Sequence, residues 1–137
     1  MFRRSHLNYG NDTFTKFSES VVFENVCNGR KAANLADYKN DLIPLVRTTT
    51  SYNNPVQKFL PIHYELVENI RNVSEIKEIE LNNAMIEIEP KYRNMGYHSD
   101  QMLDLVEDSY ICIFSCYDNI SAEKNNDTRK LKIAICQ

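Results

Sequence analysis

The sequence predicts a single α+β domain in which one helix precedes several short strands that form a mainly antiparallel barrel or jelly-roll part. Its 137 residues suffice for one hydrophobic core, and 42% apolar with 26% charged residues is ordinary for a globular protein. The helix pattern lies at residues 61–70, where apolar side chains recur at helical spacing behind a proline. Alternating or continuous apolar patterns predict strands at 84–89, 109–117 and 129–135.

The first forty residues carry the weakest patterns. Residues 1–18 are polar and lack periodicity, so we expect a loose lead-in ahead of one domain that spans 19–137. The β-branched pair in residues 21–23 marks a possible strand start. Residues 29–40 indicate a loop, with a short helical turn at 32–35 as its only regular part.

The next segments are better defined. Residues 42–50 are β-branched and apolar, which predicts an extended segment, and Pro44 favours the edge of a sheet. A turn cluster follows at 51–54. Pro61 suits the first turn of the helix, and His63 is expected to be a helix-face or capping residue. One helix face collects the apolar side chains Ile62, Leu66, Val67 and Ile70.

The second half of the chain favours strands. Residues 84–89 alternate between apolar and polar side chains, which is typical of a half-buried strand. Residues 90–96 then connect this strand to another that contains His98. Residues 109–117 are strongly apolar and predict a buried strand, and a polar loop separates them from the alternating residues 129–135.

Charge and cysteine usage exclude several classes of protein. A formal net charge of −3 argues against a broad nucleic-acid footprint, because phosphate binding needs a basic face, although a local one stays open. The four cysteines form no C-x-x-C pair, which argues against zinc, and Cys112 and Cys116 are expected to be reduced core thiols. The charged N-terminus indicates no secretory signal, and no apolar run is long enough for a membrane span. We therefore expect a cytoplasmic or nuclear protein with no membrane partner.

The most informative stretch is 95–101, which contains the pair His98-x-Asp100. Residues two apart in a strand project from the same face, so an imidazole and a carboxylate would lie side by side. Such a pair supplies two of the three ligands in the 2-His-1-carboxylate triad of non-haem Fe(II). No histidine follows His98, so we expect the third ligand to be missing from this chain. His6 lies in the polar lead-in and His63 on the predicted helix, and we expect neither to replace it.

Two stretches, 95–101 (MGYHSDQ) and 109–117 (SYICIFSCY), look like the Fe(II)- and 2-oxoglutarate-dependent dioxygenases. Within them they most resemble the AlkB-like group, which includes viral members, and the richness in Asn, Ile and Lys suggests an AT-rich genome of that kind. Upstream, residues 44–52 resemble the substrate-lid region of the group. The resemblance covers 42–135 and implies a double-stranded β-helix (jelly-roll) fold, of which this chain holds the amino-terminal portion behind a helical and extended region.

The resemblance also assigns roles to individual residues. His98 and Asp100 match the first two iron ligands, and the flanking Tyr97 and Gln101 match positions that orient the ligands or wall the pocket. The resemblance places two further residues at the substrate entrance, Arg47 and Tyr52. The cofactors it implies are Fe(II) and 2-oxoglutarate.

Three departures from the group's pattern stand out. The distal histidine is absent, and so is the arginine that follows it and holds 2-oxoglutarate; Arg129 precedes that position and is expected to be a surface residue. Ile86 and Ile88 stand where many relatives place Asn and Tyr for the cosubstrate. We therefore expect weak or absent binding of iron and 2-oxoglutarate by this chain alone.

These observations lead to three functional hypotheses. The first is an incomplete AlkB-like dioxygenase that, when complete, oxidises a nucleic-acid base or a related substrate. The second is a non-catalytic binding or interaction protein that keeps part of the oxygenase fold. The third is an α+β domain of other ancestry in which His98 and Asp100 are merely paired. Exposed strand edges around 131–136 would invite a complementing C-terminal half or a second copy of the chain.

Overall fold

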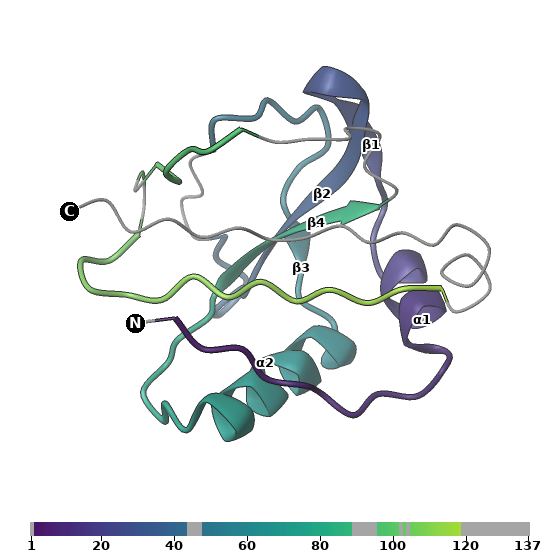
Figure 1. Cartoon of the computed structure of the whole chain (residues 1–137). Helices are drawn as coiled ribbons and strands as arrows, with labels where there is room; N and C mark the ends of the chain where they lie inside the picture. Colours follow the sequence, from purple (N-terminus) through teal and green to yellow (C-terminus); the bar gives the residue numbers. More distant parts are fainter. Residues whose placement is uncertain (1, 44–47, 89–95, 102, 104, 119–137) are drawn as a thin grey trace.

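The computed structural model describes residues 2–43, 48–88, 96–101, 103 and 105–118, and it confirms the α+β class. Two helices accompany a small mixed sheet of four strands (Figure 1). The elements in chain order are α1 (Thr13–Glu19), β1 (Glu24–Val26), β2 (Arg30–Ala36), β3 (Gln57–Lys58), α2 (Pro61–Ser74) and β4 (Asn83–Ile88).

Strand β2 is the centre of the sheet, because it pairs with each of the other three strands. It pairs antiparallel with β4 over residues 31–36 along one edge. The other edge carries β1, antiparallel to residues 30–32, and β3, parallel to residues 35–36. The loop and helical turn expected at 29–40 are therefore wrong for residues 30–36, whereas residues 37–40 lie outside the named strands, as expected for a loop. The Ala-Ala-Asn-Leu-Ala run has little intrinsic preference for strands, but its small side chains are buried here, and tertiary packing outweighs local propensity.

A tight hairpin connects β1 to β2. Val26 pairs with Arg30, so the turn contains only Cys27–Gly29, which form a single 3₁₀ turn. Gly29 has a φ of 71°, the left-handed conformation that such three-residue hairpin loops need at this position. The expected strand start at 21–23 lies just before β1, and the Gln57 side chain fixes it by bonding both backbone groups of Val22 at 2.8 Å.

Helix α1 begins inside the segment 1–18 that we expected to be a loose lead-in, so that prediction is wrong for residues 13–18. Thr13 and Phe17, four residues apart, are the two buried side chains of the helix, which shows that one face packs inward. The Thr13 hydroxyl also donates to the carbonyl oxygen of Gly10 at 2.6 Å. Two buried positions are too few to be recognised in the sequence as a helical period.

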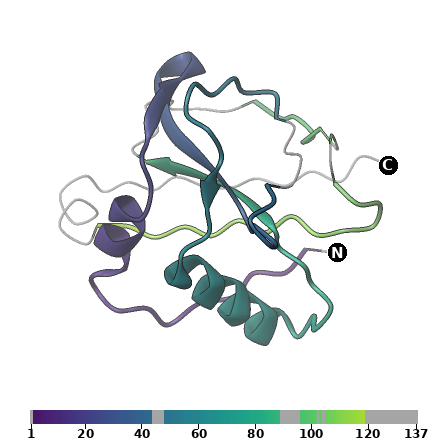
Figure 2. The same ribbon diagram turned by 180° about the vertical axis from the view of Figure 1, so that it is seen from behind.

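Helix α2 and strand β4 confirm the helix predicted at 61–70 and the strand predicted at 84–89. Pro61 is the first helical residue of α2, as expected, and the helix ends where Glu75 adopts a left-handed conformation with φ of 58°. Arg71 donates from Nε to the carbonyl oxygen of Ile79 at 2.9 Å, which ties the end of the helix to the chain leading into β4. In both views α2 runs along one side of the sheet, and its first turn lies near α1 (Figures 1 and 2).

The two faces of the sheet differ in chemistry. Paired residues share a face, so Ala33, Leu35 and their partners Ile86 and Ala84 form an apolar face. The opposite face carries Arg30, Asn34 and Glu87, and the chain at 48–56 covers it. The buried apolar residues of the described core are Phe17, Ala32, Ala33, Leu35, Ala36, Phe59 and Ile79.

The strands expected after residue 90 are wrong where the structure describes them. Residues 96–101 and 109–117 form no strand, and Ile111 and Ile113 are 56% and 71% exposed. Cys112 is exposed and Cys116 only half-buried, so neither is the core thiol that we expected, although both are free. Residues 109–117 are largely apolar, as the sequence shows, but no described strand pairs with them. Residues 48–50 of the predicted 42–50 segment are not a strand, whereas 44–47 and 129–135 lie outside the described residues.

Candidate functional site

His98 and Asp100 lie together, although the segment that holds them has no regular structure. Nε2 of His98 is 3.5 Å from Oδ1 of Asp100. Nδ1 of His98 is 2.9 Å from the carbonyl oxygen of Gly96. A carbonyl can only accept, so Nδ1 carries the hydrogen of this bond. In the neutral ring Nε2 then carries an electron pair, and this nitrogen and the carboxylate oxygen are close enough to share a metal cation.

The residues expected around the pair do not enclose it. The His98 and Asp100 side chains are 53% and 60% exposed, and Tyr97 is 76% exposed. Gln101 is exposed as well. In the described part of the chain no cluster of three histidine, cysteine, aspartate or glutamate side chains could hold a metal ion. His98 and Asp100 therefore form an open, two-donor arrangement on the surface.

Tyr52, which the sequence placed at a substrate entrance, lies on the polar face of the sheet, while Arg47 lies outside the described residues. The Tyr52 hydroxyl is buried and has no hydrogen-bond partner among the residues that the structure describes. Burial raises the pKa of the phenol; the Arg30 charge opposes this shift, and the carboxylates of Glu87 and Glu24 add to it. Tyr52 is thus a protonated donor beside the Arg30–Glu87 pair.

Arg30 is the most highly bonded cation of this face. Its Nη1 donates to Oε1 of Glu87 at 2.5 Å, and its Nη2 donates to the Thr50 hydroxyl at 2.9 Å. The pair is mostly buried, with 16% and 15% of the two side chains exposed. The guanidinium has its donors engaged within the protein, so the cluster joins β2, β4 and the covering loop instead of offering an anion site. This cluster could not be predicted from the sequence, because residues far apart in the chain carry no local signal of an ion pair.

Ser20 and His63 form a half-buried hydroxyl–imidazole contact, with Oγ and Nε2 2.9 Å apart. The hydrogen bonds fix the direction of this contact. Nδ1 of His63 accepts from the backbone N–H of Leu60 at 2.8 Å, so in the neutral ring the hydrogen is on Nε2 and points to Ser20. The Ser20 hydroxyl in turn donates to the carbonyl oxygen of Phe17 at 2.7 Å. The imidazole is a donor to the serine, the reverse of a general base, so the pair is not a nucleophilic dyad.

These contacts also explain the structural role of His63 at the start of α2. The bond to Leu60 confirms the capping role expected from the sequence, because it satisfies a backbone N–H before the first turn of α2. Both ring nitrogens are occupied and only 5% of the residue is exposed. His63 therefore cannot complete an iron site with His98 in this conformation.

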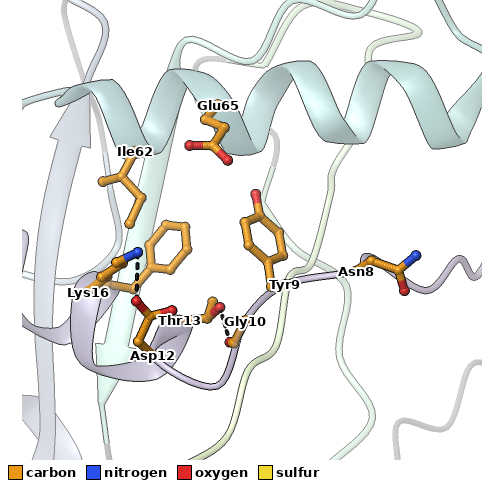
Figure 3. A pocket seen from close by; sticks show the side chains of 9 residues that line it. Asn8, Tyr9, Gly10, Asp12, Thr13, Lys16, Ile62 and Glu65 are labelled. Atoms are coloured by element: carbon orange, nitrogen blue, oxygen red, sulfur yellow. Dashed lines mark hydrogen bonds and ion pairs between the residues drawn. The ribbon is translucent and has the colours of Figure 1, made fainter.

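A shallow cavity of about 240 Å³ opens between the N-terminal segment, α1 and α2. Figure 3 shows Glu65 of α2 and Tyr9 of the N-terminal segment pointing into it. Lys16 is the cation among its described lining residues, and its ammonium lies 2.7 Å from Oδ2 of Asp12. The hydrogen bond with Asp12 raises the pKa of Lys16. The cavity is thus a polar depression whose cation is already paired.

Neither described helix is long and apolar enough to cross a lipid bilayer. Comparison with known proteins found no match to this sequence, whether among family models, curated proteins or solved structures.

Proposed function

We propose that this chain contributes the His98–Asp100 part of the iron site of an Fe(II)- and 2-oxoglutarate-dependent dioxygenase of the AlkB-like type, with the jelly-roll fold of that group. The observation that supports the proposal is the 3.5 Å distance between Nε2 of His98, the ring nitrogen that Gly96 leaves unused, and the Asp100 carboxylate. Two electron-pair donors that face each other at the surface suit a shared divalent cation.

The donor set fits two positions of the triad that holds non-haem Fe(II). Bound iron would supply the activation of O2 that oxidises a C–H bond of the substrate with 2-oxoglutarate as cosubstrate. The protein's own part is to orient the ligands. The Gly96 carbonyl holds the imidazole through Nδ1 and increases the electron density on Nε2, as partners of metal-bound histidines usually do. The substrate class is a nucleic-acid base or a related compound, bound locally because the chain is acidic overall.

Anaerobic titration of the purified chain with Fe(II), followed by calorimetry, tests this proposal. We expect one weak site per chain, and we expect His98→Ala and Asp100→Asn each to weaken it at least tenfold, because one of two donors is lost. His6→Ala is the matched control, since it removes an exposed histidine elsewhere on the chain. Unchanged affinity in His98→Ala, or an equal loss in His6→Ala, would show that the metal does not bind at His98.

A second candidate function, a non-catalytic interaction protein, is favoured by a row of exposed apolar side chains on 106–117. Five of them are at least half exposed: Val106, Tyr110, Ile111, Ile113 and Tyr117. Soluble proteins rarely leave such a row uncovered, and we propose that a second copy of the chain covers it.

Sedimentation velocity over a range of concentrations checks this candidate. The wild-type chain is expected to self-associate, and Ile113→Asp to weaken the association at least tenfold, because a charge would have to be buried at the contact. Leu42→Asp, at a position that is 72% exposed outside the row, should leave the association unchanged. A wild-type chain that is monomeric at every concentration contradicts the candidate.

A further inference from the structure

The His63 ring lies at the junction between α1 and α2. It is 5% exposed and packs between two aromatic rings, with centroid distances of 6.1 Å to Phe17 and 5.7 Å to Phe59. Through Nε2 it contacts Ser20, the residue that ends α1, and through Nδ1 it caps the first turn of α2 at Leu60. One side chain therefore joins the end of one helix to the start of the other.

Each hydrogen bond around the His63 ring has a defined donor and a defined acceptor. The Leu60 N–H points at Nδ1, Nε2–H points at the Ser20 oxygen, and the Ser20 O–H points at the carbonyl oxygen of Phe17. A second proton on the ring can only bind Nδ1, since Nε2 already carries one. It would then face the Leu60 N–H at 2.8 Å, donor against donor, so the imidazolium is incompatible with the cap.

We propose that His63 is an acid-sensitive latch, in which protonation of Nδ1 breaks the cap of α2 and releases α1 together with the N-terminal segment. The release would uncover an aromatic cluster. Phe17 of α1 packs against Phe114 at a centroid distance of 5.5 Å, and Tyr9 packs against Phe114 at 5.7 Å. The latch involves none of the residues of the proposed iron site.

The surroundings of the ring favour its neutral form. Burial is the cause that lowers the pKa of His63 below its usual value of 6.5. The neighbouring elements also carry ionisable groups. On α1, β3 and α2 these are exposed charges, and on the segments before α1 and at 105–118 they are a phenol and a thiol: Lys16, Glu19, Lys58, Glu65, Tyr9 and Cys116.

The lowered pKa of His63 determines whether the latch opens toward low or high pH. The released ring binds its proton at the usual pKa of about 6.5, and the latched ring binds it only at lower pH. The latch is therefore fully closed above pH 6.5 and weakens as the pH falls from there toward the lower pKa of the latched ring. One proton is taken up per opening, so the closed fraction relative to the open one falls up to tenfold per pH unit in this window.

Hydrogen exchange of the full-length chain between pH 7.5 and 5, corrected for the intrinsic rate, tests the latch. Peptides from 13–20 are expected to lose protection by about tenfold per pH unit below 6.5, whereas peptides from β2 keep theirs. His63→Asn places an uncharged acceptor near the position of Nδ1, so this variant should retain α1 protection at low pH. His6→Asn is the control and should behave like the wild type.

Two results would overturn the latch: the same pH-dependent loss in His63→Asn, or a simultaneous loss in the α1 and β2 peptides of the wild type. Nitrogen chemical shifts of the His63 ring give a test that needs no variant. At pH 7.5 they should show hydrogen on Nε2 and none on Nδ1, and His63 should titrate together with the opening of α1. The opposite tautomer, or titration without opening, refutes the mechanism.

Discussion

Replacing Leu35 by alanine is expected to lower the free energy of unfolding by about 3 kcal/mol, a typical cost of deleting a fully buried leucine side chain. Leu35 has no exposed surface. It lies opposite Ala84 in the neighbouring strand, so the adjacent position offers no larger side chain that could fill the cavity. Urea denaturation followed by far-ultraviolet circular dichroism measures the change, which suits a chain without tryptophan.

Leu42→Ala is the control for this experiment, because it removes the same atoms from a side chain that is 72% exposed. Its expected effect is about 0.5 kcal/mol or less. Equal losses in the two variants would mean that Leu35 is not in the core and that β2 is not the central strand. An unchanged m-value would confirm that only stability, and not the compactness of either state, differs.

Replacing Glu87 by alanine is expected to destabilise the fold by about 2–3 kcal/mol, because the Arg30 guanidinium then stays largely buried without its carboxylate. Only 16% of the Arg30 side chain is exposed, so water replaces the lost oxygen poorly. The buried Tyr52 hydroxyl beside the pair has no described bond of its own and cannot accept enough hydrogen bonds to compensate. The same urea titration measures this effect.

Glu87 makes a further contact besides the one to Arg30, so a double-mutant cycle is needed to isolate the ion pair. Arg30→Ala, Glu87→Ala and the double variant should give a coupling energy of about 1.5 kcal/mol or more. If the losses of stability in the two single variants add up to the loss in the double variant, the ion pair contributes no coupling energy. Lys16→Ala, which breaks the exposed pair with Asp12, is the matched control and should change stability little, since water screens both charges.

The fold could be predicted from the sequence only where the local pattern and the tertiary environment agree. Pro61 and the periodic apolar residues that follow it define α2, and alternation defines β4 at 83–88. Strand β2 could not be predicted, because Ala32, Ala33 and Ala36 have low strand propensity and become a strand only by pairing on both edges. Helix α1 is too short for its two buried positions to form a recognisable period.

The closeness of His98 and Asp100 could be predicted from the sequence, and the setting of the pair could not. The spacing of His98 and Asp100 brings the two side chains together, as expected, but their segment is not a strand and both are exposed. The capping role of His63 was expected from its place in the helix, whereas its contact with Ser20 was not. That contact depends on how α1 packs against α2, and no pattern within either segment encodes it.

The pairing of residues 31–36 with residues 83–88 has a consequence for biosynthesis. The β1–β2 hairpin can close as soon as it leaves the ribosome, because its partners are adjacent in sequence. The other edge of β2 has to wait until the chain has been extended through residue 88 and that stretch has cleared the exit tunnel. During this interval the nascent chain displays an alanine-lined strand without its long-range neighbour, and it is in this interval that a chaperone or a second nascent chain can compete for it.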